Sequence, residues 1–271
     1  MKLTTVLLPF LLTPIPVTAN PITKDTLDRH RPHPPPPPPE PLPRNPRRIG
    51  ILLHRAFSVL DVFGPLEILQ ALSRQTHLQL FLLSRDGPSG PGVSTAPASV
   101  VMNRFNSSFF PVIPATHGLS KAEAPPELDV LIVPGGLGAR SPDLGPEVEY
   151  IKRVFGQLDY LITICTGTGI AAQAGVLDGR RATTNKAAWA TITAMGPKVK
   201  WVSPARWVED GKVWSSSGVT AGLDLTFEFI RKKYDNGSEI AEAIAGNMEH
   251  ERVRDWRYDP WARRFGVPDQ N

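Results

Sequence analysis

A single cysteine is the residue in this sequence best suited to covalent chemistry. Cys165 directly follows the apolar run 160–164 and precedes four small residues, Thr166-Gly167-Thr168-Gly169. A strand, a tight turn and a helix in that order project a nucleophile from the end of a sheet. The free amides and partial positive charge at the start of such a helix favour a thiolate, so the pattern predicts a lowered pKa for Cys165. The alternative is a buried cysteine that only fills space.

A Pro-Gly-Gly turn closes the apolar run 129–133, which comes before the cysteine strand. Paired glycines let backbone amides approach a ligand closely, and Gly135 and Gly136 are such a pair. The Gly136 amide could therefore act together with the amide of Thr166 as an oxyanion hole. Taken alone, the same three residues indicate no more than a turn.

Two acidic residues are candidates for work beside the thiol. Asp61 lies just before the segment 62–72, whose apolar residues recur at helical spacing, with Pro65 near the start of that helix. An acid at this point lies at the top of the sheet, where it can move a proton for Cys165. Asp is equally well suited to capping the helix. Glu67, on the same helix, is the rival acid unless it is simply an exposed residue.

The elements that must position these residues alternate along the chain. Apolar runs predict strands at 49–54, 78–83, 129–133 and 160–164, and helical patterns occur at 62–72, 147–155, 220–234 and 239–248. Buried strands that alternate with helices predict a mostly parallel sheet covered on both faces. Asp210-Gly211, between two short β-prone runs, predicts a hairpin.

Length and composition exclude several classes of protein. The 271 residues, 41% of them hydrophobic, are enough for one large domain. The net charge of +4 is small, and the basic residues are scattered, so nucleic-acid binding is not expected. One cysteine provides neither a zinc-type Cys/His spacing nor an internal disulfide, and no metal is expected.

The N-terminus predicts export from the cell. Residues 1–19 combine Met1-Lys2, an apolar run and a small-residue ending, which is typical of a signal peptide and predicts a secreted protein. The run is shorter than the roughly 20 apolar residues of a membrane span, so no membrane association is expected. Glycosylation triplets at Asn106 and Asn236 suit the same compartment.

A proline-rich stretch separates this leader from the domain. Residues 20–46 include an unbroken proline run at 34–39, which predicts a disordered, extended linker. A ligand for a proline-recognition domain is the alternative. The folded domain is predicted over 47–250, and the aromatic-containing extension 251–271 is expected to pack back onto it.

Five motifs, taken in order, resemble the DJ-1/PfpI superfamily. They are Asp61–Glu67, Asp129–Gly136, Ile164–Gly167, Leu177–Thr184 and Ser217–Asp224. The resemblance implies a flavodoxin-like, DJ-1-like α/β fold: a three-layer α/β/α sandwich with a mostly parallel sheet and a small hairpin. It also implies a homodimer.

Within the superfamily, the sequence looks most like the isocyanide (isonitrile) hydratase branch and the amidase-like domain of certain transcriptional regulators. That branch has Cys-Thr-Gly after the strand and an Asp in its Asp-x-x-Gly-Pro motif. The protease-like branch has a His directly after the cysteine, where this chain has Thr166. Asn185 stands where related sequences often have a His, which leaves Asp61 as the best candidate for a base.

The resemblance implies a cysteine-dependent enzyme that acts on a small electrophile without a cofactor. Attack by Cys165 on an isonitrile, with Asp61 relaying the proton, would give an N-formamide. The candidate oxyanion and substrate-binding residues are Gly135, Gly136, Thr166, Glu67, Asn185 and Ser217. Two alternatives remain open: a glyoxalase III-like activity on α-oxoaldehydes, and a non-catalytic cysteine redox sensor or binding module whose thiolate is oxidised to a sulfinate.

Overall fold

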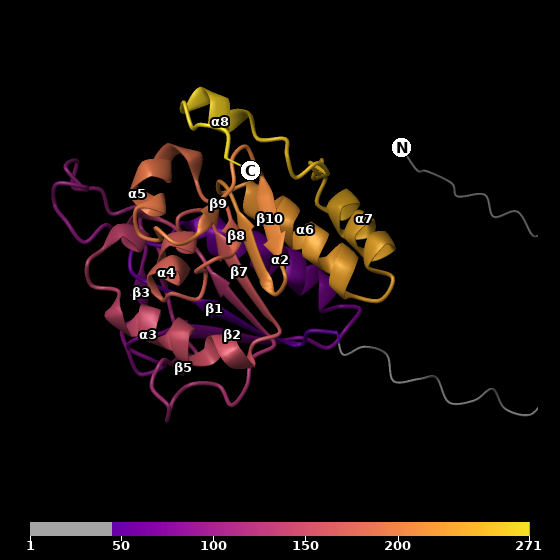
Figure 1. Ribbon diagram of the computed structural model, residues 1–271. Helices are drawn as coiled ribbons and strands as arrows, with labels where there is room; N and C mark the ends of the chain where they lie inside the picture. Colours follow the sequence, from indigo (N-terminus) through magenta and orange to yellow (C-terminus); the bar gives the residue numbers. More distant parts are fainter. Residues whose placement is uncertain (1–44, 271) are drawn as a thin grey trace, which may run out of the picture. The chain divides into compact units, whose positions relative to one another are not determined.

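The computed structural model describes residues 45–270. The predicted leader 1–19 lies outside the described residues, as does the predicted linker 20–46 apart from its last two residues. The described residues form a three-layer α/β/α sandwich (Figure 1). This confirms the predicted fold class.

A seven-stranded sheet forms the middle layer. From edge to edge its strands are β10 (Trp207–Asp210), β11 (Val213–Ser216), β7 (Tyr160–Ile164), β6 (Val130–Val133), β1 (Arg48–Leu52), β2 (Gln79–Ser84) and β5 (His117–Gly118). Every neighbouring pair is parallel except β10 with β11. The carboxyl ends of β6 and β7 therefore lie side by side, which brings the Pro-Gly-Gly turn next to the cysteine.

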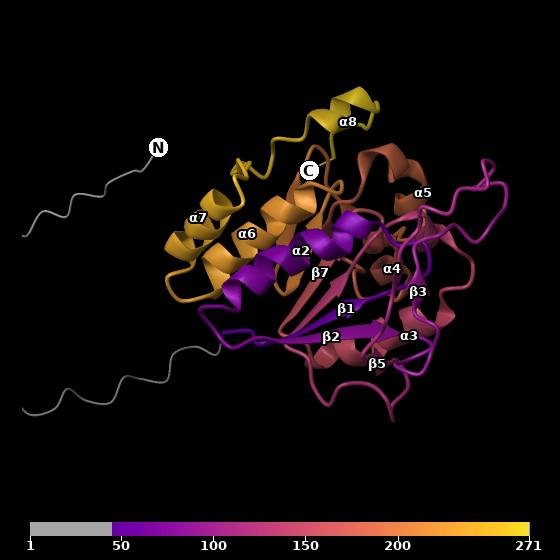
Figure 2. The same ribbon diagram turned by 180° about the vertical axis from the view of Figure 1, so that it is seen from behind.

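Helices cover both faces of this sheet (Figures 1 and 2). One face carries α2 (Val59–Leu72), α6 (Ala221–Lys233) and α7 (Gly237–Asn247), and the other carries α3 (Gly145–Val154) and α4 (Gly167–Gln173). Successive side chains of a strand point to opposite faces, so Ile51 joins the core under α2 and α6 while Leu52 joins the core under α3 and α4.

The predicted hairpin is confirmed. Strands β10 and β11 pair antiparallel with Asp210 opposite Val213, and Gly211 adopts a left-handed φ of 59° in the turn between them. Strand β11 then runs parallel to β7, with Ser216 beside Ile164. The hairpin thus completes one side of the strand that ends at Cys165.

Helix α2 starts earlier than the sequence pattern predicts. It begins at Val59 rather than Val62, so Asp61 lies in its first turn and Pro65 in its interior. Val59 is 42% exposed and gives no core-facing signal, which explains the late predicted start. Because Pro65 has no amide proton, the backbone hydrogen bond that would end on the Asp61 carbonyl cannot form.

The remaining elements are short. They are the pairs β3 (Val93–Ser94) with β4 (Val112–Ile113) and β8 (Arg181–Ala182) with β9 (Lys200–Trp201), the helices α5 (Trp189–Thr193) and α8 (Pro260–Arg264), and several 3-10 turns. Two-residue strands are too short to produce a periodic pattern, so the sequence gives no sign of them. Across residues 45–270, no helix has the length and apolar character to cross a membrane.

The C-terminal extension lies against the domain. The Arg206 amide donates to the carbonyl of Trp256 at 2.6 Å, and Ser203 forms an antiparallel bridge with Gln270. Helix α8 belongs to this extension and follows the end of α7 by way of an irregular segment (Figure 2). The extension therefore contributes side chains to the same end of the molecule as the 3-10 turn and short helix that follow β8.

Candidate active site

Cys165 occupies a sharp turn between β7 and α4. Its φ is 58°, in the left-handed region that residues other than glycine seldom adopt, and its amide donates to the Ser216 carbonyl at 3.2 Å. A strained backbone at the end of a parallel strand is typical of a functional residue. The side chain is buried, with 5% of the residue exposed. The sulfur is therefore largely shielded from solvent.

Asp61 reaches the same place from the first turn of α2. It is completely buried, and its Oδ2 accepts a hydrogen bond from the Gly135 amide at 2.9 Å. Among the described residues, its Oδ1 has no partner in normal hydrogen-bond geometry. A buried carboxylate oxygen without a donor is costly, and it is the atom best placed to receive a proton.

The Asp61 carboxyl and the Cys165 thiol influence each other's ionisation. Burial raises the pKa of Asp61 to about 6, against hydrogen bonds from Gly135, Ser58 and the thiol that lower it. Burial also raises the pKa of Cys165 to about 12, and the charge of Asp61 raises it further. At neutral pH the pair therefore holds one proton, and that proton is on sulfur.

The predicted lowering of the Cys165 pKa is wrong for the unliganded protein. Hydrogen bonds from the Thr166 amide, the Asn185 side chain and the Thr166 side chain do lower the pKa, as expected at a helix start. They are outweighed by burial and by the nearby carboxylate. At neutral pH the thiol is therefore protonated beside an ionised carboxylate.

The two glycines of the Pro-Gly-Gly turn are tied to this pair. The Gly136 amide donates to Thr166 Oγ1 at 2.9 Å, and that hydroxyl donates back to the Gly136 carbonyl at 3.0 Å. The Gly135 amide is taken by Asp61. In the structure the Gly136 amide is thus engaged by Thr166, and its oxyanion role stays a prediction. The Thr166 amide hydrogen-bonds to the sulfur and lowers the pKa of the thiol.

Neither glycine can be replaced without disturbing the site. A Cβ on Gly135 would lie 2.5 Å from the Thr166 amide nitrogen and 3.0 Å from Asp61 Oδ2. Gly136 has a φ of 127°, and a Cβ there would lie 2.4 Å from the carbonyl oxygen of Ala56. The glycines allow the β6 turn to approach the elbow closely.

Asn185 meets the cysteine from a third direction. Its Oδ1 accepts the Ala188 amide at 3.1 Å at the start of the 3-10 turn η4 (Lys186–Ala188), which leaves its NH₂ group to donate elsewhere. The Asn185 side chain hydrogen-bonds to the sulfur and lowers the pKa of Cys165. The preceding residue, Thr184, donates its hydroxyl to the Cys165 carbonyl at 2.8 Å.

Two predicted site residues do not take part. Glu67 is exposed on α2; six residues after Asp61, it points about 120° away around the helix axis at 3.6 residues per turn. The Ser217 hydroxyl is taken up by Asp259 at 3.2 Å and Lys186 at 3.1 Å. The predicted roles of Glu67 as rival acid and of Ser217 as substrate ligand are therefore not supported.

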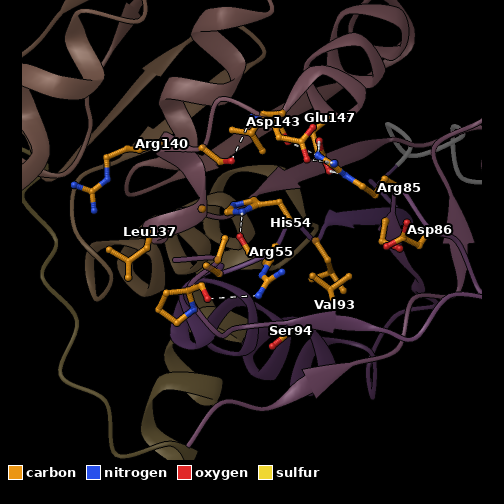
Figure 3. A pocket seen from close by; sticks show the side chains of 18 of the residues that line it. His54, Arg55, Arg85, Asp86, Val93, Ser94, Leu137, Arg140, Asp143 and Glu147 are labelled. Atoms are coloured by element: carbon orange, nitrogen blue, oxygen red, sulfur yellow. Dashed lines mark hydrogen bonds and ion pairs between the residues drawn. The ribbon is translucent and has the colours of Figure 1, made fainter. Parts of the chain in front are cut away.

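A mixed cavity of 730 Å³ lies beside the residues that follow the Pro-Gly-Gly turn, with Leu137 and Arg140 in its lining (Figure 3). Its lining includes His54, Arg55 and Arg85 but not Cys165. His54 is buried, with Nε2 3.0 Å from the Pro134 carbonyl, and burial lowers its pKa, so this ring supports the turn as a neutral group. Within residues 45–270, no three His, Cys, Asp or Glu side chains gather as metal ligands.

Sequence reasoning missed four residues that support the cysteine elbow or the Pro-Gly-Gly turn: His54, Thr184, Lys186 and Asp259. Their roles depend on contacts between distant segments, such as the 2.8 Å ion pair of Lys186 with Asp259. A lysine next to Asn185 in the sequence gives no local sign that it is buried. No pattern in the sequence could have paired it with a residue of the C-terminal extension.

The chain can now be compared with known proteins. Residues 47–232, more than half of the chain, match the DJ-1/PfpI family. The chain belongs to the DJ-1/PfpI family. It is 28% identical over 213 residues to isonitrile hydratase from Pseudomonas putida, an alignment that covers 75% of this chain and 78% of the hydratase.

Other proteins are similar over comparable lengths. The HTH-type transcriptional regulator GbdR from Pseudomonas aeruginosa is 26% identical over 217 residues, and the chain spans about half of that regulator (53%). The crystal structure of a ThiJ/PfpI family protein from Pseudomonas syringae superposes with a TM-score of 0.62 at 22% identity, covering 83% of this chain and 85% of that one. This structural likeness supports the fold.

Proposed function

We propose that this DJ-1/PfpI protein is a cysteine-dependent hydro-lyase that adds water to a small isonitrile and releases an N-formamide. The observation that carries the proposal is the pairing of a lone thiol at a strained strand end with a buried carboxylate of raised pKa. Similarity to isonitrile hydratase over three quarters of both chains supports this substrate class.

In the first step, the Cys165 sulfur bonds to the terminal carbon of the isonitrile. The thiol proton passes to the free Oδ1 of Asp61 as the sulfur attacks, and is then delivered to the same carbon. The product is a thioimidate bound to the enzyme through sulfur. A carboxyl group with a pKa of about 6 is ionised at neutral pH. Because the thiol has a pKa of about 12, its proton moves to Asp61 only as the carbon–sulfur bond forms.

In the second step, water attacks the thioimidate carbon. Asp61 takes one proton from the water and passes it to the substrate nitrogen, which leaves a tetrahedral intermediate with a hydroxyl group on carbon. The carbon–sulfur bond then breaks, the hydroxyl proton passes to the sulfur, and the N-formamide leaves while Asp61 is again ionised. The sum is one water added to one isonitrile, so no oxidant or reductant is consumed. The Thr166 amide faces the sulfur and stabilises negative charge on it as the bond breaks.

Exposed apolar side chains lie on the segments that lead to the site, and they suit contact with a second protein chain. Val59, Leu60 and Phe63, at the start of α2, are 39–42% exposed, and Leu137 is 43% exposed. The two segments are joined by the hydrogen bond from the Ser58 amide to the Gly135 carbonyl. A homodimer would cover this apolar surface, and light scattering of the wild type and of Leu60→Glu would test it. The proposed dimer predicts twice the monomer mass for the wild type and a lower mass for the variant.

Turnover by the purified protein tests the proposed activity. An alkyl isonitrile should be converted to its N-formamide, detected by mass spectrometry, and Cys165→Ala and Cys165→Ser should both lose activity by at least about a thousandfold. Methylglyoxal is the second substrate in the assay. Conversion of methylglyoxal alone would replace the proposal with the α-oxoaldehyde activity, and inertness toward both substrates would refute a hydro-lyase.

A further inference from the structure

A buried lysine stands directly beside Asn185, the residue that meets the sulfur. The side chain of Lys186 is 0% exposed, and its ammonium group is surrounded by oxygen. Four uncharged oxygens lie within hydrogen-bond distance: Thr183 Oγ1 (2.9 Å), the Ala205 carbonyl (3.0 Å), Ser217 Oγ (3.1 Å) and the Thr184 carbonyl (3.2 Å). The ammonium is therefore held from several segments at once.

Its charge is balanced by a single residue of the C-terminal extension. Within residues 45–270, Asp259 is the one carboxylate at ion-pair distance from Lys186, at 2.8 Å, and its own side chain is 1% exposed. Asp259 also caps α8, because its Oδ1 accepts the Trp261 amide at 3.2 Å. Removing one partner of such a pair leaves an uncompensated buried charge, so the position of the extension and the position of Lys186 depend on each other.

Lys186 is joined to the cysteine through its two neighbours. Thr184 donates its hydroxyl to the Cys165 carbonyl at 2.8 Å, which ties this segment directly to the elbow. The Asn185 side chain, one residue on, lowers the pKa of the Cys165 thiol by hydrogen bonding. The ammonium also bonds to the Thr184 carbonyl, and so fixes the backbone on which both donors are carried. Movement of Lys186 would displace the Asn185 donor from the sulfur.

We propose that Lys186 and Asp259 are positioning residues of the Cys165 site, and that the C-terminal extension completes this site by holding Asn185 against the sulfur. Any effect of this role on turnover rests on the proposed hydro-lyase function. The placement of Asn185 beside Cys165 can be tested through the reactivity of the thiol alone. Asp259 lies beyond residues 47–232, the part that matches the family, so the site depends on a segment outside the family match.

Thiol alkylation across a pH range tests the claim without any turnover. The rate constant for iodoacetamide should be measured between pH 7 and 10 for the wild type, Asn185→Ala and Asp259→Asn. Loss of the Asn185 donor should slow alkylation at a given pH about tenfold, as a pKa rise of one unit would. Asp259→Asn should lower the alkylation rate constant by a similar factor, and Asp259→Glu should restore part of the rate. In the Asn185→Ala background, Asp259→Asn should lower the rate constant little further.

A second ion pair, far from the cysteine in its contacts, serves as a control that distinguishes a positioning role of Asp259 from a general loss of stability. Arg85 and Glu147 form a 2.7 Å pair whose carboxylate is likewise 1% exposed, and both line the cavity from which Cys165 is absent. Glu147→Gln should lower stability but leave the alkylation profile unchanged. An Asp259→Asn profile that superposes on the wild type, with a stability loss like that of Glu147→Gln, would overturn the proposal.

A second variant guards against misfolding. The double substitution Lys186→Met with Asp259→Leu removes both charges, and replacing a buried pair by apolar residues is often neutral for stability. It should fold and still show the slowed alkylation. Isonitrile turnover is measured separately. If the wild type does not convert the isonitrile but the variants still show slowed alkylation, the hydro-lyase proposal is refuted and the positioning role of Lys186 and Asp259 is supported. Normal alkylation in the double variant would refute the positional claim.

Discussion

The Asp61 carboxylate raises the pKa of Cys165, while the Cys165 thiol donates to Asp61 and lowers the pKa of that carboxyl. The resting protein thus keeps one proton between the two groups. Nucleophilic chemistry at the sulfur would require this proton to move, and the ionised Asp61 carboxylate is the group beside the sulfur that can take it.

Replacing Asp61 by Asn should separate the reactivity of the thiol from catalysis. Loss of the negative charge lowers the pKa of Cys165, so alkylation by iodoacetamide at pH 8 should become faster than in the wild type. Turnover should fall by about 10²- to 10⁴-fold, because the group that moves the proton is gone. Glu67→Gln, an exposed change on the same helix, should alter neither rate. Slower alkylation in Asp61→Asn would contradict the coupling.

The same substitution should change how stability depends on pH. The folded-state pKa of Asp61 is about 6 and its ordinary value is 3.8, so between these values the folded protein keeps a proton that the unfolded chain has released. Stability contributed by this group is present below pH 4 and lost as the pH rises through 6. From pH 4 to 7, wild type should lose about 2 to 3 kcal/mol relative to Asp61→Asn.

Urea denaturation at pH 4, 5, 6 and 7 measures this difference. The Asn side chain can still accept the Gly135 amide, so the comparison isolates the ionisation of Asp61. A difference between the two proteins that does not vary with pH would show that Asp61 ionises as freely as a surface carboxyl.

A methyl group on Gly135 should damage the site directly. Its Cβ would press on Thr166 and Asp61, so Gly135→Ala should lower kcat/KM at least about tenfold and stability by about 1 to 3 kcal/mol. Gly246→Ala is the control, since nothing lies within 4 Å of a Cβ there and the residue is exposed on α7. It should be neutral or slightly stabilising. Equal activities of the two variants would refute this account of the turn.

The hydroxyl of Thr166 should matter more than its methyl group. Thr166→Val leaves the Gly136 amide and carbonyl without their partner, whereas Thr166→Ser keeps a hydroxyl at the same position. The Val variant should lose about 1 to 3 kcal/mol of stability and at least about tenfold in kcat/KM, and the Ser variant should stay within a fewfold of wild type. Thermal melts and isonitrile kinetics check both. Similar losses in Ser and Val would assign the effect to packing.

Much of the fold follows from local sequence patterns. The apolar run 160–164 predicts β7 with its observed bounds, and the small residues after it predict the Cys165 elbow. Buried central strands show a continuous apolar run, which is why these elements can be recognised. The pattern of apolar residues predicts the start of the first helix three residues too late, because Val59 and Leu60 are exposed and do not belong to the buried face of the helix.

The electrostatics of the site could not be inferred in the same way. A helix start beside a cysteine predicts a lowered pKa, but the sign depends on burial and on Asp61, which arrives from a helix across the sheet. The use of the Gly136 amide by Thr166 and the pairing of Lys186 with Asp259 likewise join segments distant in sequence. The spacing of residues within a short segment cannot predict contacts between segments that are distant in the sequence.

The burial of the Cys165 sulfur affects how readily the thiol is oxidised. Oxidants attack the thiolate, and a shielded thiol with a pKa of about 12 offers almost none at neutral pH. The chain has no second cysteine with which an oxidised sulfur could close a ring. Because its proton stays on the sulfur, the Cys165 thiol should therefore resist oxidation in surroundings where an exposed cysteine would be oxidised.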